Sequence, residues 1–321
     1  MPLPLLRMLL IGLISLGANM VYGEDFPNKP IRIVTSNPGG GSDFVARVIA
    51  QGLTSNLGKQ VIVENRGGAG GIIAALTVAK GLPDGYTLLL YASNLWLLPY
   101  LQDNVPYDPV RDFLPITLAD SSPNLLVVHP SVPVNSVKEL IALAKAKPGA
   151  LNYAQGALGS PPHLSAELFK AMAGVDIVRI AYKSSGPAIF DLIGGRVQLM
   201  FSVPGAATPH VKSGKLKALA VTSAQPSDLF PGMPTVAASG VPGYVTESNH
   251  GLFAPAKTPV TLINRLNQEI VRVLKQPDVK EKFLNIGVEP VGGSPKEYAA
   301  YIKSDMAKMG KVIKDAGIRA D

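Results

Sequence analysis

The sequence predicts an α/β fold, in which helices cover the faces of sheets that contain parallel strands. Three observations predict it. Short apolar runs rich in β-branched residues recur along the chain, stretches of helical periodicity lie between them, and a second such series follows the first. In folds of this class, ligands bind at the loops that follow the carboxyl ends of the strands.

The first predicted strand, Ile31–Ser36, leads into the glycines Gly39–Gly41. Ser42 and Asp43 come next and offer oxygens to cap a helix that we expect to begin at Phe44. Glycines let backbone N–H groups approach a ligand, and a helix N-terminus carries about half a positive charge. The stretch therefore predicts a site for an anion.

The remaining predicted elements continue the alternation of strand and helix. Strands are expected at Gln60–Glu64, Tyr86–Tyr91, Phe113–Leu118, Leu125–His129, Val178–Tyr182, Val197–Phe201, Leu216–Thr222 and Gly251–Ala254. Helices are expected at Ile72–Lys80, from Ser136 to Lys147, after Ser160 and at Pro187–Ile193, and the chain from Lys257 onward is expected to be helical. Ser136 with Glu139 and Ser294 with Glu297 are capping boxes that mark two helix starts.

The first 23 residues have the organisation of a secretory signal peptide. Arg7 is the only charged residue before the apolar run Met8–Ala18, which is shorter than the roughly 20 residues needed to span a bilayer. Val21 and Gly23 are small enough for the recognition positions before a cleavage that would leave Glu24 as the first residue. The alternative is an uncleaved membrane anchor, for which the run is short. We expect residues 1–23 to be removed on export.

The net charge of +7 is scattered along the chain, and its densest group is Lys212, Lys215 and Lys217. Because no basic run is interleaved with aromatic residues, nucleic-acid binding is not expected. A mild attraction for small anions is the more economical interpretation. The chain has no cysteine, which excludes a lipid anchor on that residue. After the leader no apolar run approaches roughly 18 residues, so stable membrane insertion is not expected.

Sequence motifs for metals, nucleotides and serine hydrolysis are incomplete. His129, His163, His210 and His250 are far apart and show no two-histidine spacing typical of a metal site. The Gly-x-Ser-x-Gly elbow, the phosphate-loop pattern and the dinucleotide-binding glycine fingerprint all fail. The sequence therefore predicts no metal and no cofactor.

Three features of the sequence have two interpretations each. His163 and Glu167, one helical turn apart, form either a structural hydrogen bond or part of a ligand cleft. Asp43 either caps its helix or meets a donor group of a ligand. Trp96, the only tryptophan, is either a core residue or a reporter at the rim of a cleft.

A series of short motifs runs through the chain after the leader. They are Pro30–Val34 with Pro38–Asp43, Val61–Arg66 with Gly70–Gly71, Pro83–Leu88, Leu151–Tyr153 with Gly159–Ser160, His163–Glu167, Tyr182–Lys183 with Gly186–Ala188, Asp191–Leu192, Gly214–Ala220, Gly251–Pro255 and Lys311–Lys314. Each motif alone is weak, but the series in this order and at this spacing is specific. The chain resembles the substrate-binding proteins of tripartite tricarboxylate transporters, also called the Bug family.

This resemblance implies a two-domain, type II-like periplasmic binding protein, with mixed sheets flanked by helices and a ligand cleft between the domains. Domain 1 would hold residues 24–125 and 250–321, and domain 2 would hold residues 126–249. The resemblance also implies a monomer without catalytic activity in the periplasm of a Gram-negative bacterium. Its partners would be a small organic acid, such as a di- or tricarboxylic or aromatic acid, and the membrane subunits of a transporter.

The resemblance further implies which residues hold the ligand carboxylate. By position these are Asn37, Gly39, Gly40, Gly41, Ser42, Asp43, Ser93 and Asn94 from one side of the cleft, and Gly156, Ser160, His163, Ser202, Val203 and His250 from the remainder of the chain. Two positions depart from the family. Ser202 stands where an acidic residue is common, and Asn249 with His250 replaces a common aromatic pair. A serine and a histidine suit a second carboxylate or a hydroxyl, and losing the acid argues against an amino group.

Two other functions stay open at this point. The same kind of binding protein would serve a two-component sensor instead of a transporter, and the sequence does not separate these. A hydrolase on the same scaffold would use Ser160 or Ser202 as nucleophile and His163 or His250 as base, although no motif supports either pairing.

Overall fold

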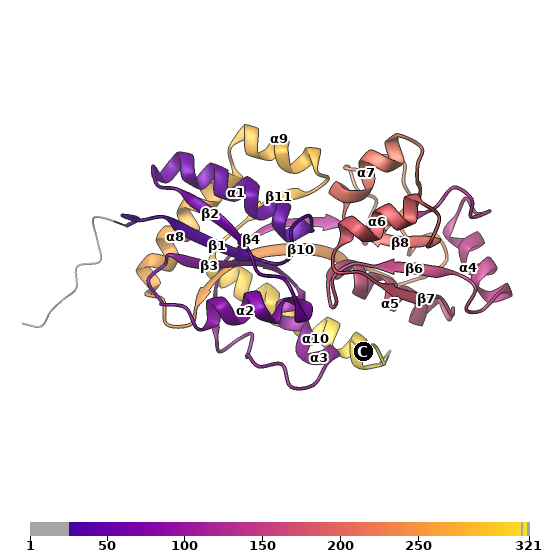
Figure 1. Cartoon of the computed structure of the whole chain (residues 1–321), viewed down its shortest axis with the longest axis horizontal. Coiled ribbons are helices and arrows are strands. Elements are labelled where there is room, and N and C mark those ends of the chain that lie inside the picture. Colours follow the sequence, from indigo (N-terminus) through magenta and orange to yellow (C-terminus); the bar gives the residue numbers. More distant parts are fainter. Residues whose placement is uncertain (1–25, 316, 320–321) are drawn as a thin grey trace, which may run out of the picture.

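The computed structural model of the chain describes residues 26–315 and 317–319, so the predicted signal peptide lies outside the described residues. Two lobes lie side by side, each built on its own sheet with helices on both faces (Figure 1). The first lobe contains a six-stranded sheet and the second lobe a five-stranded sheet. Within the described ranges, no helix has both the length and the apolar character needed to cross a membrane.

The sheet of the first lobe has the strand order β11-β4-β10-β3-β1-β2. Strand β1 pairs in parallel with β2 and β3, whereas β10 and β11 pair antiparallel with their neighbours. The strands are β1 (Ile31–Thr35), β2 (Val61–Asn65), β3 (Thr87–Ala92), β4 (Phe113–Pro123), β10 (Glu247–Pro255) and β11 (Glu289–Gly292). The helices are α1 (Gly41–Leu57), α2 (Ile72–Ala79), preceded by the 3₁₀ turn η1 (Ala69–Gly71), α3 (Asn94–Leu101), α8 (Val260–Leu274), α9 (Pro277–Asn285) and α10 (Pro295–Asp315).

The sheet of the second lobe has the strand order β7-β6-β8-β5-β9. Strand β6 pairs in parallel with β7 and β8, and β5 pairs antiparallel with β8 and β9. The strands are β5 (Leu125–Val128), β6 (Asn152–Gln155), β7 (Val178–Ala181), β8 (Leu199–Ser202) and β9 (Lys217–Val221). The helices are α4 (Val137–Ala146), α5 (Pro161–Ala173), α6 (Ser185–Ile193) and α7 (Pro204–Lys212).

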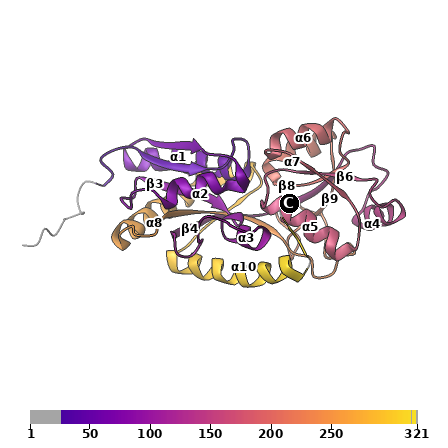
Figure 2. The same ribbon diagram turned by 60° about the horizontal axis from the view of Figure 1, so that its bottom comes forward.

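Helices cover both faces of each sheet because strand residues alternate between two apolar sides. In β5, Leu126 and Val128 pack in the cluster that includes α4 and α5, whereas Leu125 and Val127 pack in the cluster that includes α6 and α7. In the first lobe, α1, α8 and α9 share one core cluster, and α2, α3 and α10 share the other. Figure 2 shows α10 running along the outside of the first lobe.

The long strands β4 and β10 run from the first lobe to the junction with the second and pair along their length (Figure 1). Asn124 leads directly from β4 into β5, and its side chain is completely buried. Asn124 Nδ2 donates to Ser165 Oγ at 3.0 Å, and Ser248 Oγ donates to Asn124 Oδ1 at 2.7 Å. The junction is therefore held by a buried polar network that joins both lobes. By sheet membership, Leu125 belongs to the second lobe and Glu247–Asn249 belongs to the first lobe. The domain limits inferred from the family resemblance stay a prediction.

Most predicted elements occur in the structure, with three differences of detail. Helix α1 begins at Gly41 rather than at Phe44, and its N-cap is Gly40 without a side-chain cap, so the predicted capping by Ser42 or Asp43 is wrong. Strand β4 continues from Phe113 through Pro115 to Pro123, because β10 pairs with it over that whole length. The helical region after Lys257 contains the edge strand β11, whose Pro290 lies where a sheet tolerates proline.

Candidate ligand-binding site

The glycine loop after β1 holds the N-terminus of α1 open toward the second lobe. Gly39 has φ +77°, a left-handed conformation that favours glycine, and Gly40 is the N-cap of α1. The first N–H groups of a helix lack intrahelical acceptors, and here no side chain caps them. This end of α1 therefore offers backbone donors and a partial positive charge to an anion.

Asp43 fixes the shape of this loop. Its Oδ2 accepts the backbone N–H of Gly39 at 3.0 Å and Arg47 Nε at 3.2 Å, and its Oδ1 accepts Asn65 Nδ2 at 2.8 Å. Burial raises the pKa of Asp43, but these hydrogen bonds and the Arg47 charge outweigh it and leave the pKa below its usual value. Both oxygens are occupied by protein donors, which favours a structural role over contact with a ligand.

A narrow cavity, here called the front cavity, lies between the two lobes. Its lining is Ser36, Asn37, Gly40, Gly41, Ser42, Tyr91, Ala92, Asn94, Ala157, Ser160, Pro161, Pro162, Ser184, Ser185, Val203, Ser248 and His250. The first residues or N-caps of five helices (α1, α3, α5, α6 and α7) are in this set, and none of the five has a side-chain cap. In residues 26–315 and 317–319, no Asp, Glu, Lys or Arg lines the cavity. Converging helix N-termini without a competing carboxylate suit an anionic ligand.

Eight of the predicted site residues meet at the front cavity. They are Asn37, Gly40, Gly41, Ser42, Asn94, Ser160, Val203 and His250. Of these, Asn37 Nδ2 also donates to the backbone carbonyl of Lys183 at 2.8 Å, a direct hydrogen bond from the first lobe to the second. The lobes therefore touch across the cavity.

The other predicted residues lie around the front cavity rather than in its lining. Gly39 and Asp43 shape the loop, as described above. A Cβ on Gly156 would lie 3.0 Å from Ser185 Oγ, so glycine there lets the start of α6 approach β6. Ser202 is completely buried, and its Oγ donates to the neighbouring Val203 carbonyl at 3.2 Å. Ser93 lines a different cavity.

His163 is completely buried near the start of α5. Its Nδ1 accepts the backbone N–H of Gly159 at 3.0 Å, and burial lowers its pKa to about 4, so the ring is neutral at pH 7. Glu167 instead accepts the Tyr153 hydroxyl and Lys170 Nζ. His163 Nε2 has no hydrogen-bond partner among the described residues, so within them His163 does not form the base–nucleophile hydrogen bond that a hydrolase using Ser160 would need. His163 supports the loop before α5.

Asp120 on β4, which no sequence motif singled out, pairs with His250 on β10. His250 Nδ1 lies 2.9 Å from Asp120 Oδ1 and 3.1 Å from Oδ2, and both side chains are almost completely buried. The other ring nitrogen, Nε2, would lie only 2.9 Å from a Cβ placed on Gly41. His250 therefore brings its Nε2 to the same place as the N-terminus of α1.

Other lining residues were also missed, among them Ser184, Ser185 and Ser248. Ser184 and Ser185 follow β7 and precede the body of α6, which is the same strand–loop–helix pattern that identified Gly39–Ser42. That pattern was a usable signal. Ser248 gave no such signal, because nothing in a strand pattern says which buried polar residue faces a cavity.

Trp96 is a core residue. It is completely buried, packs against Phe253, Tyr298 and Tyr301, and donates from Nε1 to Asp305 Oδ2 at 2.7 Å. The interpretation of Trp96 as a residue at the rim of the cleft is wrong. In the same turn, Ser93, the N-cap of α3, lines another cavity, and Asn94 lines the front cavity.

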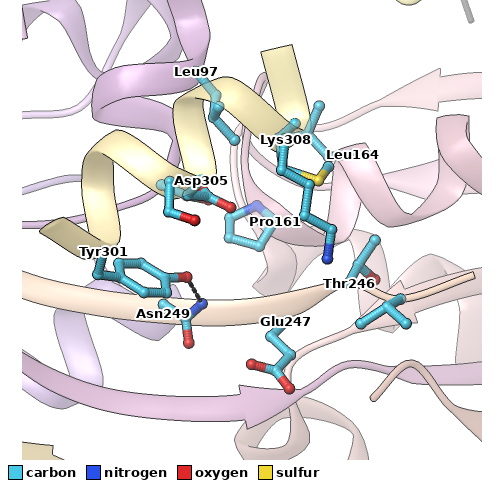
Figure 3. Close-up of a pocket in the computed structure, with 13 residues that line it drawn as sticks. Leu97, Pro161, Leu164, Thr246, Glu247, Asn249, Tyr301, Asp305 and Lys308 are labelled. Carbon is cyan, nitrogen blue, oxygen red and sulfur yellow. Dashed lines mark hydrogen bonds between the residues drawn. The ribbon is translucent and has the colours of Figure 1, made fainter. Parts of the chain in front are cut away.

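A second, wider cavity, here called the rear cavity, lies on the other side of β10 (Figure 3). Ser248 and His250 line the front cavity, while Glu247 and Asn249 line the rear one, as expected for alternating residues of one strand. The rear cavity contains the carboxylates of Glu247 and Asp305 and the ammonium of Lys308 (Figure 3). Burial, with a contribution from Glu247, raises the pKa of Asp305. Two acids around one lysine make this a poorer place for an organic acid than the front cavity.

Comparison with known proteins is consistent with this geometry. A sequence model described as "Tripartite tricarboxylate transporter family receptor" matches residues 45–318. The chain belongs to this family. The family is one of solute-binding receptors, which confirms the expectation that the chain is not an enzyme.

Three similar proteins represent the family. Protein BugT of Bordetella pertussis is 38% identical over 302 residues, which cover 93% of each chain. The structure of Rpa4515 of R. palustris with adipate matches with a TM-score of 0.88 and 39% identity, over 92% of this chain and 99% of that one. MatC of Rhodopseudomonas palustris with bound malate matches with a TM-score of 0.85 and 29% identity, over 90% of this chain and 100% of that one. These matches confirm the predicted architecture of two mixed sheets flanked by helices.

Proposed function

We propose that the chain is an exported receptor that captures a small dicarboxylate in the front cavity, between its two domains. The observation that carries this proposal is the convergence of uncapped helix N-termini on a cavity lined by no Asp, Glu, Lys or Arg. A carboxylate placed there would accept backbone N–H groups at the start of α1 and hydroxyl groups from Ser42, Ser160 or Ser185.

The relatives support a dicarboxylate in particular. Two solved members of similar fold hold adipate and malate, which both carry two carboxyl groups. The cavity of this chain is lined by polar groups from both lobes, so a ligand with an acidic group at each end would bridge them and stabilise the closed arrangement. We propose a linear dicarboxylate of about four to six carbons as the ligand class, on the size of those two acids.

We further propose that the receptor works in the periplasm and delivers its ligand to the membrane subunits of a tripartite transporter. The predicted signal peptide at residues 1–23 and the family membership support this role. Loss of uptake in a deletion strain would support delivery to a transporter. Binding of the purified receptor to the extracellular domain of a sensor kinase, with uptake intact, would favour the sensor alternative instead.

A thermal-shift screen tests the capture of an acid. The purified receptor would be heated with adipate, malate, succinate, citrate and benzoate, and with glucose, putrescine and glutamine as neutral, cationic and zwitterionic controls. We expect at least one dicarboxylate to raise the melting temperature and the control compounds to leave it unchanged, because a ligand that binds only the folded state stabilises it. A panel in which no acid raises the melting temperature, or in which putrescine does, would contradict the proposal.

A further inference from the structure

The Asp120–His250 pair determines which hydrogen-bonding group His250 presents to the front cavity. A carboxylate accepts hydrogen bonds and does not donate them. Asp120 Oδ1 lies 2.9 Å from His250 Nδ1 and also accepts the backbone N–H of His250 at 3.3 Å. The hydrogen-bond pattern therefore assigns the ring proton to Nδ1. In a neutral ring, Nε2 then carries no proton, and its lone pair accepts hydrogen bonds.

Nε2 of His250 has no protein partner in the described part of the chain and belongs to a side chain that is 5% exposed. It lies beside Gly41, at the N-terminus of α1, in the lining of the front cavity. A neutral His250 would point a lone pair at a ligand carboxylate, and two acceptors repel each other. A protonated ring donates from both nitrogens, to Asp120 and to the ligand.

The charged groups around the ring come from few elements. Strand β4 contributes Asp120, which also faces Tyr298 of α10 and helps to raise the pKa of that tyrosine. Helix α1 contributes its N-terminus, while Asp43 in the same turn is paired with Arg47. The His250 ring also lines a small third cavity, distinct from the front and rear cavities. Its other lining residues carry no charge; they are Phe44, Val45, Ser122, Val203, Pro204, Ile286, Val288 and two glycines. Among these neighbours, Asp120 is the ionisable side chain that directly contacts the ring.

We propose that capture of a dicarboxylate is coupled to the uptake of one proton by the Asp120–His250 pair. This inference rests on the proposed function, because it takes the ligand to carry a carboxylate that faces Nε2. The proton comes from solvent and is held between Nε2 and the ligand oxygen, and no covalent bond forms or breaks. His250 is then the residue that selects an acidic group at this end of the ligand, and Asp120 is the positioning residue that fixes its Nδ1–H.

A proton-linked site has a defined pH signature. Where binding takes up one proton, affinity for a dicarboxylate falls by up to about tenfold for each unit that the pH rises. The coupling would make the receptor retain its ligand more tightly in acidic surroundings.

Titration calorimetry tests the coupling. The purified receptor would be titrated with adipate between pH 6 and 9, at each pH in two buffers that differ in ionisation enthalpy. The difference in heat between the buffers counts the protons bound. We expect up to one proton to be taken up when adipate binds to the native receptor within this range.

Two variants of the pair separate its two roles. His250→Gln keeps a neutral side chain of similar length, and we expect its adipate affinity to be independent of pH. Asp120→Asn no longer requires Nδ1 to carry the proton, so the neutral ring can present Nε2–H, and we expect the pH dependence to flatten while adipate still binds at pH 8. Melting curves of both variants identify any loss of fold, and a purely structural role of Asp120 would leave the pH profile unchanged.

The possible outcomes distinguish a failure of the proposed proton coupling from a failure of the proposed function. If adipate or another dicarboxylate binds the native receptor with no proton uptake across the range, the coupling is overturned and the proposed function stands. The coupling is also overturned if His250→Gln shows the native proton uptake. If none of the acids binds at any pH, both the proposed function and the coupling fail.

Discussion

Asn37 in the first lobe donates from its Nδ2 to the main-chain carbonyl of Lys183 in the second lobe, at 2.8 Å. The donor follows β1 and the acceptor follows β7, so this hydrogen bond joins the rims of the two sheets across the front cavity. Because the acceptor is a backbone atom, the contact does not depend on the side chain of Lys183. We interpret it as a latch of the closed arrangement.

Asn37→Ala should weaken ligand binding without unfolding the protein. A hydrogen bond of this kind contributes a net of about 0.5–1.5 kcal/mol, so the dissociation constant should rise roughly twofold to tenfold. Calorimetry with the dicarboxylate found in the screen measures it. Asn264→Ala, on the exposed face of α8, is the matched control and should bind as the native receptor does. Equal affinities for the two variants would show that the contact is not a latch.

Ser42→Glu should abolish binding of an acid. The new carboxylate would stand in the lining of the front cavity, beside the N–H groups at the start of α1. A like charge about 4 Å from the ligand costs about 4 kcal/mol at an effective dielectric constant of 20, roughly a thousandfold in affinity. Ser55→Glu, exposed on the last turns of the same helix, is the control. Native affinity in Ser42→Glu would exclude this loop from the anion site.

Asn124→Ala should destabilise the junction between the lobes. The side chain is completely buried and bonds both Ser165 and Ser248, whose hydroxyls would lose a partner. Unsatisfied buried groups cost about 1–3 kcal/mol each, so we expect the free energy of unfolding to fall by about 2–4 kcal/mol in urea denaturation. A loss below about 0.5 kcal/mol, the range of ordinary surface substitutions, would show that the network contributes little.

His163 should make the protein less stable in mild acid. Burial lowers its pKa to about 4, whereas the unfolded chain has the ordinary value of 6.5. Between these values the unfolded state binds a proton that the folded state does not. The contribution of His163 to the free energy of unfolding is therefore fully present above pH 6.5. It falls by about 1.4 kcal/mol per pH unit as the pH drops toward 4.

The comparison that isolates His163 is the pH slope of a variant. His163→Asn keeps an oxygen near the position of Nδ1 to accept the Gly159 N–H, but it does not titrate. Urea denaturation of both proteins from pH 7 to pH 4.5 gives the two slopes. We expect the variant to be less stable at pH 7 and to lose less stability on acidification. Parallel slopes would mean that His163 is protonated equally in both states.

The sequence predicts the architecture well because local signals agree with the fold. The capping box at Ser294 forms as expected, and Ser136 caps its helix while Glu139 accepts the backbone N–H of Asn135. The stripe of Leu262, Leu266, Ile270 and Val273 is buried on α8. Strand β11 was not predicted, because a four-residue edge strand with a proline carries no periodic signal. The start of α1 was placed late since Gly40, not Ser42 or Asp43, is its N-cap.

The strand–loop–helix pattern predicts part of the candidate site, and the family resemblance adds residues such as His250, which lies within β10. Gly40, Gly41, Ser42 and Ser160 line the front cavity because they stand at helix starts beside strand ends. The role of Asp120 could not be predicted from the sequence, because it depends on the strand register that pairs Asp120 with His250, more than a hundred residues away. Such a pairing of two strands far apart in sequence is decided by the whole sheet, and not by any local pattern.

The most direct test of the account is a crystal structure of the receptor grown with the dicarboxylate that raises its melting temperature most. We predict one carboxylate within ~3 Å of the backbone N–H groups at Gly41 and Ser42, in the front cavity, with Asn37 still bonded to the Lys183 carbonyl. An acid bound in the rear cavity beside Lys308, with the front cavity free of ligand, would contradict the account.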